Sequence, residues 1–269
     1  MKTAFLILGA QRSGTSVISH VLSTFGINFG NPQRFIQGEH NPIFFELDWV
    51  NDINNQIVQQ SGHEYIDFFL PIELDFEGEK FAALEQKIQA FVLQEWGNCD
   101  AIALKDPRFS LTFSVWQRVL TALGYRLNII LAFRCPSGFL ASNKKLFHNW
   151  AGWTDQRHLN FWLQFNLAAI YFTRHCSTYW MNYDHLMADP QAEVQALAEF
   201  FALDRAAIAA ATSVIQPSQY HHQTIVPTGF PLIDNYYDRL RLHQLDATDY
   251  LHYREQFEQF QSAKSLQST

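Results

Sequence analysis

A short apolar run that leads into a turn bracketed by two glycines constrains this chain more than any other feature. Residues 6–16 read LILGAQRSGTS, and apolar residues at helical spacing follow them. Gly9 and Gly14 allow a tight turn in which successive backbone N–H groups converge on one anion. The positive end of the following helix adds to the attraction. The segment therefore predicts a phosphate-binding loop between a buried strand and a helix.

This loop differs from the one that binds nucleoside triphosphates. Gly9 and Gly14 have the spacing of the G-x-x-x-x-G-K-[ST] loop, but Thr15 stands where that loop has its lysine. The basic residue is Arg12, ahead of the second glycine, and two hydroxyls, Thr15 and Ser16, come after it. An ordinary nucleotide triphosphatase is therefore disfavoured.

The rest of the chain alternates between strand-like and helix-like patterns. Four apolar or β-rich runs have the length of strands: 3–8, 101–104, 127–133 and 178–183. Consecutive apolar positions suit strands covered on both faces. Residues with helical spacing predict helices over 13–25, 81–96, 111–123, 138–147, 159–174 and 191–201. The pattern predicts an α/β fold of three layers, α/β/α, with a central parallel sheet and a site at the carboxyl ends of its strands.

The chain has no internal division into domains. No repeat, linker or charge block interrupts its 269 residues, so we expect a single domain over 1–269. Two stretches lack a regular pattern, namely 29–75, which is rich in Asn, Gln, Pro and aromatic residues, and the tail after Gln216. We expect the first to be an irregular segment that covers the substrate.

Composition narrows the class of ligand and the compartment. The balance of 19 Lys+Arg against 26 Asp+Glu gives a net charge of -7, which argues against a nucleic-acid binder. The three cysteines form no CxxC pair, which favours a reducing cytoplasm over a disulfide framework or a cysteine zinc site. The apolar run at the start is too short for a signal peptide or a membrane span, and no later run is long enough to span a bilayer.

The glycine loop resembles that of a known enzyme family. Arg12-Ser13-Gly14-Thr15-Ser16 is similar to the K/R-S-G-T-[ST] loop of sulfotransferases. In that family the loop binds the 5′-phosphosulfate of 3′-phosphoadenosine 5′-phosphosulfate (PAPS), without a metal. The resemblance implies a P-loop nucleotide-binding-like sulfotransferase fold, with residues 11–16 on the donor: Gln11, Arg12, Ser13, Gly14, Thr15 and Ser16.

A second phosphate-binding element follows the third expected strand. Arg134 ends that strand and Ser142 comes eight positions later, a spacing that resembles the sulfotransferase grip on the 3′-phosphate of the donor. The guanidinium offers a planar fork to phosphate oxygens, and the hydroxyl adds a donor near a helix start. Lys144 and Lys145, just beyond, are better explained as a solvated basic face.

The second expected strand ends in a charged run. Lys105-Asp106-Pro107-Arg108 is similar to the K-D-P-R run of many bacterial sulfotransferases. The resemblance implies that Lys105 reaches the transferring sulfonate and that Arg108 lines the donor or acceptor pocket. Asp106 is held ionised beside two cations, which suits an orienting role better than that of a base. The alternative for this run is a structural cluster of ion pairs.

A candidate base lies after the loop helix. Residues 40–46, HNPIFFE, are similar to an N-P-x-G-[YF]-[FW]-E run whose Glu is taken as the base in bacterial and carbohydrate-type sulfotransferases, although Ile43 replaces the usual Gly. The resemblance makes Glu46 the base and places His40, Phe44 and Phe45 near the substrate. Flanking aromatic rings partly desolvate a carboxylate, which raises its pKa toward the useful range. His40 and His148 are the fallback bases.

These features together predict a transferase. The hypothesis is in-line transfer of sulfonate from PAPS to a hydroxyl of an unidentified acceptor, with Glu46, Lys105 and Arg12 as catalytic residues and no metal. A small hydrophobic alcohol or natural product, a lipid and a glycan are all open as the acceptor, in that order of preference. No histidine pattern predicts zinc, because His63-Glu64 lacks a second His. Two alternatives remain, a phosphotransferase that uses Mg–ATP and a binding protein that kept the fold without the chemistry. Val17 stands where cytosolic sulfotransferases have the aromatic residue that stacks on adenine, and the late R-K-G segment of those relatives has no counterpart after Gln216.

Overall fold

A four-stranded parallel sheet forms the centre of the molecule. The computed structural model describes residues 2–38, 44–67, 76, 78–97, 99–146, 152–216 and 225–256. The strands lie in the order β2-β1-β3-β4 and every neighbouring pair is parallel. Their bounds are β1 Thr3–Leu8, β2 Ala101–Lys105, β3 Arg126–Phe133 and β4 Thr178–Asn182. The sequence prediction of four parallel strands is confirmed, with ends that differ by a residue.

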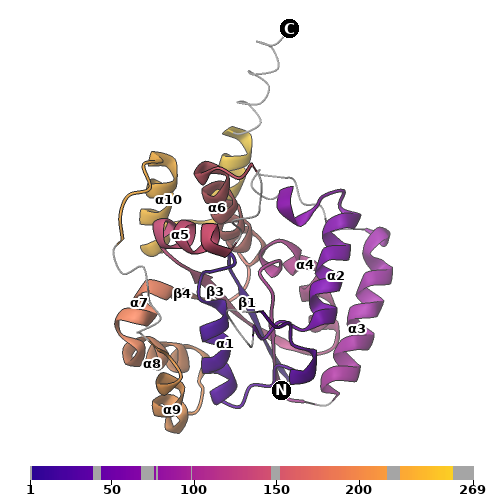
Figure 1. Ribbon diagram of the computed structural model, residues 1–269. Coiled ribbons are helices and arrows are strands. Elements are labelled where there is room, and N and C mark those ends of the chain that lie inside the picture. Colours follow the sequence, from indigo (N-terminus) through magenta and orange to yellow (C-terminus); the bar gives the residue numbers. More distant parts are fainter. Residues whose placement is uncertain are drawn as a thin grey trace.

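Helices cover both faces of the sheet because successive strand residues point to opposite faces, and the residues on both faces are apolar. Ala4, Leu6 and Leu8 of β1 join one buried cluster, and Phe5 and Ile7 join the other. The first cluster includes α3 (Ala82–Trp96), α4 (Phe109–Ala122) and α6 (Asp155–Phe172). The second includes α1 (Thr15–Thr24), α8 (Pro190–Phe201) and α9 (Ile208–Ser213). Figure 1 shows this three-layer arrangement, so the predicted α/β/α architecture is confirmed.

The predicted helices are all present. They correspond to α1, α3, α4, α6, α8 and α5 (Pro136–Leu146). A short helix, α7 (Tyr183–Ala188), joins β4 to α8. Asp189 caps α8 by accepting a hydrogen bond from the Ala192 N–H at 3.0 Å, and Pro190 occupies the first turn, where its missing N–H costs no hydrogen bond.

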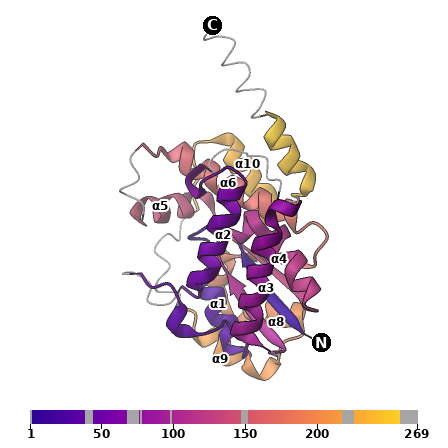
Figure 2. The same ribbon diagram turned by 90° about the vertical axis from the view of Figure 1, so that its right-hand side faces the viewer.

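The expectation of an irregular segment over 29–75 is wrong for part of its length. Residues Asp48–Gln60 form α2, which lies beside α3 and α4 (Figure 2). Asn54 Oδ1 accepts hydrogen bonds from Thr112 Oγ1 and Trp116 Nε1 of α4, each at 2.8 Å. The helix buries one apolar stripe, and its many Asn and Gln residues obscure that stripe in the sequence. The buried apolar residues are Trp49, Val50, Ile53, Ile57 and Val58.

The tail after Gln216 is also more regular than its sequence suggests. It contains α10 (Pro231–Arg241) and a further helical stretch over 247–256. Their aromatic residues complete the same cluster as α4 and α6, namely Tyr236, Tyr237, Tyr250 and Tyr253. Within the described ranges, no helix has both the length and the apolar character required to cross a bilayer.

Candidate functional site

The predicted glycine loop lies at the carboxyl end of β1, between β2 and β3. Gly9 has a φ of 130°, and a Cβ there would lie 2.0 Å from the Ala132 carbonyl oxygen of β3. Gly14 has a φ of 88°, and a Cβ there would lie 2.2 Å from the Tyr183 ring. Both positions therefore require glycine, because the backbone conformation and the close neighbours exclude a side chain. The loop then enters α1 at Thr15, as the sequence predicts.

Arg12 extends from this loop toward α5. The backbone of Arg12 is in the left-handed region, with a φ of 65°. The side-chain Nε of Arg12 donates a hydrogen bond to Ser142 Oγ at 2.9 Å. Burial lowers the pKa of Arg12, and the positive charge of Arg134 lowers it further. Among the described residues, no carboxylate forms an ion pair with Arg12. Two neighbouring guanidiniums in a partly buried position favour a bound anion.

The hydroxyls of the loop fit the same anion. Ser13 Oγ is buried and has no hydrogen-bond partner in the part of the chain that the structure describes. Ser16 Oγ lies 3.4 Å from Lys105 Nζ, so the start of α1 and the end of β2 meet. Buried polar atoms are normally paired, and an orphaned hydroxyl beside a helix N-terminus points to a ligand.

Arg134 is held at the end of β3 by residues of the β4–α7 turn. Its Cζ lies 4.8 Å from the centroid of the Tyr183 ring, and its Nε lies 3.9 Å from Asp184 Oδ1. Asp184 Oδ2 also accepts a hydrogen bond from the Cys135 N–H at 2.7 Å. Tyr183 and Asp184 are not among the site residues that the sequence predicts. They contact Arg134 because β3 and β4 lie side by side in the sheet, although the two strands are far apart in the sequence.

Glu46 and Lys105 are in direct contact. Lys105 Nζ donates to Glu46 Oε1, and both side chains are largely buried. The Phe44 ring lies beside this lysine, with its centroid 5.7 Å from Lys105 Nζ. Burial raises the pKa of Glu46, Lys105 opposes this rise, and Asp106 adds to it. The structure thus joins the predicted base to the predicted sulfonate-binding lysine.

Phe45 does not face this pair. Its ring is buried against His20, Phe29 and Phe35, with centroid separations of 4.6, 4.9 and 5.3 Å. The expected substrate contact through its ring is therefore replaced by a core contact. Phe45 has a φ of 58°, so the chain turns sharply just before Glu46. His40 and His148, the two fallback bases, lie outside the described residues.

Arg108 and Asp106 form a second charged pair at the end of β2. Asp106 Oδ1 accepts from the Arg108 N–H at 2.7 Å, and Arg108 Nη1 lies 3.2 Å from both carboxylate oxygens. Burial lowers the pKa of Arg108, but the charge and hydrogen bond of Asp106, together with Tyr65 and Glu46, outweigh burial, so the pKa is raised. The guanidinium carbon lies 4.4 Å from the centroid of the Tyr65 ring. Tyr65 is a site residue that sequence reasoning missed, because it stands in an aromatic-rich segment without a motif.

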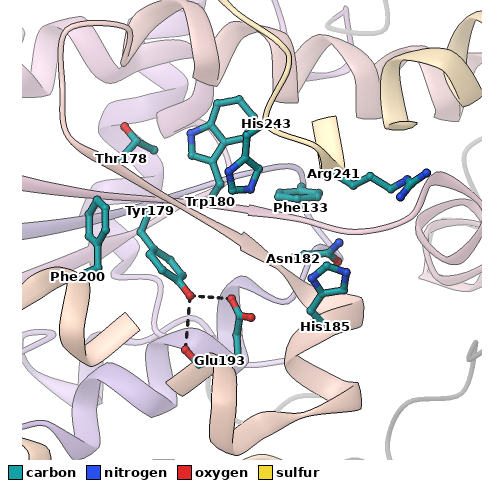
Figure 3. A pocket seen from close by; sticks show the side chains of 10 residues that line it. All are labelled: Phe133, Thr178, Tyr179, Trp180, Asn182, His185, Glu193, Phe200, Arg241 and His243. Carbon is teal, nitrogen blue, oxygen red and sulfur yellow. Dashed lines mark hydrogen bonds between the residues drawn. The ribbon is translucent and has the colours of Figure 1, made fainter. Parts of the chain in front are cut away.

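A separate cavity of about 550 Å³ lies along the outer edge of β4 (Figure 3). Tyr179 and Trp180 point to opposite sides of this strand, and Tyr179 donates to Glu193 Oε1 at 2.8 Å. None of the predicted site residues lines it. The lining residues are Phe133, Thr178, Tyr179, Trp180, Asn182, His185, Glu193, Phe200, Arg241 and His243.

Comparisons with known proteins found similar solved structures, three of which are described here. No protein-family model and no curated protein matches the chain. One is the sulfotransferase domain of the Synechococcus PCC 7002 olefin synthase, which is 17% identical to this chain with a TM-score of 0.47. The match covers 96% of this chain and 94% of that domain. The sulfotransferase domain of the curacin biosynthetic pathway is 11% identical, with 96% and 98% covered and a TM-score of 0.44. A sulfotransferase from Mycobacterium tuberculosis is 13% identical, with 83% and 76% covered and a TM-score of 0.43. Because these sequence identities and TM-scores are low, the function has to be inferred from the residues of the site.

Proposed function

We propose that the protein transfers a sulfonate group from PAPS to a hydroxyl group of a small acceptor. One observation carries the proposal. Arg12 of the loop after β1 is bonded to Ser142 of the helix after β3, which brings the two predicted phosphate-binding elements together. Lys105 and Glu46 meet beside the same loop, so a cation and a candidate base lie next to the anion site.

The donor fits the charges of the loop and of β3. Three groups are suited to the 5′-phosphosulfate. They are the backbone N–H groups at the start of α1, the guanidinium of Arg12 and the unpaired hydroxyl of Ser13. Arg134 and Ser142 are suited to the 3′-phosphate, because a guanidinium and a hydroxyl near a helix start both donate to phosphate oxygens. Since Arg12 and Ser142 are one hydrogen bond apart, a ligand with phosphates on two sides of a ribose can span them.

The proposed reaction is an in-line displacement. The acceptor oxygen forms a bond to sulfur as the bond from sulfur to the bridging phosphate oxygen breaks, and Glu46 takes the acceptor proton. Burial raises the pKa of Glu46, which makes it a better proton acceptor than an exposed carboxylate. Lys105 and the loop N–H groups neutralise the negative charge that develops on the leaving phosphate. Positioning and fixed charges provide most of the rate enhancement, as in phosphoryl transfer.

The surroundings of Glu46 favour an acceptor with an apolar body. Phe44 and Tyr65 contribute aromatic rings, and Arg108 adds one cation that Asp106 already partly neutralises. We therefore propose a small hydrophobic alcohol rather than a macromolecule as the acceptor. All three cysteines are unpaired, as in proteins of the reducing cytoplasm, where we place the reaction.

The test is a transfer assay with two donors. Purified protein is incubated with PAPS labelled on sulfur and a panel of hydrophobic alcohols, and in parallel with Mg–ATP labelled on its γ-phosphate. We expect labelled sulfate esters from PAPS, and their loss in Glu46→Gln. Label transferred only from Mg–ATP would assign a phosphotransferase instead. Binding of the donor without transfer to any member of the panel would favour a protein that kept the fold alone.

A further inference from the structure

Four side chains from separate parts of the chain form one continuous line of hydrogen bonds beside the glycine loop. Tyr65 OH donates to Gln11 Oε1 at 3.2 Å, and Gln11 Nε2 donates to Asn143 Oδ1 at 3.0 Å. Asn143 Nδ2 then lies 2.9 Å from His158 Nδ1. The line therefore connects the 65–67 turn, the glycine loop, α5 and α6.

The hydrogen bonds of this line run in one direction. Each group donates toward His158, so the last acceptor is the unprotonated Nδ1 of the imidazole. An Asn side chain between an acceptor and a donor cannot rotate by half a turn without placing like groups against each other. His158 thus fixes the orientation of Asn143, and Asn143 fixes that of Gln11. Asn143 and His158 are both buried, which restricts other rotamers.

Gln11 is anchored immediately before a strained residue. Arg12 adopts a left-handed φ of 65°, a conformation that residues other than glycine keep only when their surroundings hold them. The Arg12 side chain is held by Ser142, and the Gln11 side chain is held by Tyr65 and Asn143. Gln11 and Arg12 are consecutive, so both anchors act on the same stretch of the glycine loop to which the proposed function assigns the donor.

We infer that His158 and Asn143 are positioning residues of the donor site, which hold the glycine loop in its anion-binding shape through the side chain of Gln11. This inference rests on the proposed function for its consequence, which is donor affinity. It also changes the role of Gln11. Its side chain is a tether of the loop, whereas its sequence pattern suggested a direct contact with the donor.

Burial favours the neutral form of the His158 imidazole. Burial lowers the pKa of His158 first, Asp155 raises it and Lys144 lowers it. Asp155 and Lys144 form an ion pair at 2.7 Å, so their effects on the imidazole largely cancel. Arg157 Cζ lies 5.2 Å from the centroid of the Trp153 ring, and the centroid of the His158 ring lies 4.9 Å from it. In acid, a protonated Nδ1 would face the Nδ2 donor of Asn143, and the line would break at that link.

Two substitutions separate positioning from packing. His158→Asn places an amide oxygen near the position of Nδ1 and cannot titrate, but it loses the ring that packs on Trp153. His158→Phe keeps a ring of similar size and removes the acceptor. A purely structural role predicts that the Phe variant is the milder of the two. The positioning role predicts the reverse for ligand affinity.

The probe is 3′-phosphoadenosine 5′-phosphate, the desulfated donor, with its affinity measured by calorimetry across pH. We expect His158→Phe to weaken binding about threefold to tenfold, as for the loss of one hydrogen bond, and His158→Asn to weaken it less. The affinity of the wild type should fall in acid with the titration of His158, and that step should be absent in His158→Asn. Equal losses in both variants, or a milder effect of Phe, would overturn the inference.

A second readout needs no ligand and separates this inference from the proposed function. The side-chain amide of Gln11, assigned by its disappearance in Gln11→Ala, is followed by NMR in the free protein. We expect its resonances to move with pH at the midpoint of the His158 titration, and to stay fixed in His158→Asn. If the bisphosphate fails to bind the wild type, the proposed function fails, yet these resonances still decide whether His158 controls Gln11. A Gln11 amide that ignores the titration of His158 overturns the inference.

Discussion

Arg12 Nε donates a hydrogen bond to Ser142 Oγ at 2.9 Å, which joins the loop after β1 to the helix after β3. These two residues are 130 positions apart in the sequence, and each belongs to a different predicted phosphate-binding element. Because β1 and β3 are adjacent and parallel, both elements emerge at the same edge of the sheet. The contact therefore turns two separate sequence patterns into one positively charged site.

This contact predicts a substitution that weakens ligand binding without lowering the stability of the free protein. Arg12→Ala should weaken binding of 3′-phosphoadenosine 5′-phosphate by about tenfold to a hundredfold, the range for losing a hydrogen bond to a charged group. The free protein should not lose stability, because the substitution removes one of two neighbouring positive charges from a buried position. Calorimetry and urea unfolding measure the two quantities.

The matched control for Arg12 is an arginine of the surface. Arg205→Ala removes an exposed charge that pairs with Glu199 at 3.5 Å, and it should change neither the affinity nor the unfolding free energy appreciably. A clear loss of stability in Arg12→Ala with unchanged affinity would mean that Arg12 is a structural residue.

Glu46→Gln separates chemistry from binding. The amide keeps the size of the side chain and an acceptor for Lys105, but it cannot take a proton. We expect turnover to fall on the order of 10²-fold or more, while the affinity for the bisphosphate changes little. Initial rates with PAPS and calorimetry with the bisphosphate give the two numbers. Turnover near that of the wild type would remove Glu46 from the role of base.

Glu46 also predicts a pH dependence of stability. Its pKa is raised in the folded protein, chiefly by burial, relative to about 4.3 in an unfolded chain. In the window above pH 4.3, the folded state therefore holds more of this proton than the unfolded state does, and stability falls as pH rises toward the folded pKa. Glu46→Gln should lack this contribution. Urea unfolding at a series of pH values should show a difference between the two proteins that favours the variant increasingly as pH rises.

The link between α2 and α4 predicts a substitution that affects the fold and leaves the site intact. Asn54→Ala removes the acceptor of Trp116 Nε1, which is fully buried, and should cost about 2 kcal/mol of unfolding free energy. Gln56→Ala, on the exposed face of the same helix, should stay within about 0.5 kcal/mol. Both variants should bind the bisphosphate once folded. An Asn54→Ala protein as stable as the wild type would show that this hydrogen bond is replaced by another.

The sequence was most informative where one local pattern determines one element. Continuous apolar runs identified β1 to β4, and the spacing of Gly9, Gly14 and Arg12 identified the loop, because backbone conformation limits which residues these positions accept. Helix α2 was not predicted, since its Asn-rich surface hides a narrow apolar stripe whose partner is α4. Such a stripe is recognisable only when the neighbouring helix is known.

Contacts between distant segments account for what the sequence could not predict at the site. The sequence named Glu46 and Lys105 separately, but their direct contact depends on how the chain turns at Phe45. Phe45 itself has the character of a substrate-contacting aromatic, and only the three rings around it show that it belongs to the core. Tyr65 carries no motif and joins the site through Gln11 and Arg108.

Thermal unfolding with two ligands shows whether the glycine loop and Arg134 form a donor site for a sulfonate carrier. The protein is melted with 3′-phosphoadenosine 5′-phosphate and, separately, with Mg–ATP. At 100 times its dissociation constant, a ligand stabilises the native state by about 2.7 kcal/mol, a rise of a few degrees in Tm for a domain of this size. We expect this rise with the bisphosphate and none with Mg–ATP. A rise with Mg–ATP alone would contradict the sulfonate donor site and assign the glycine loop to a phosphotransferase.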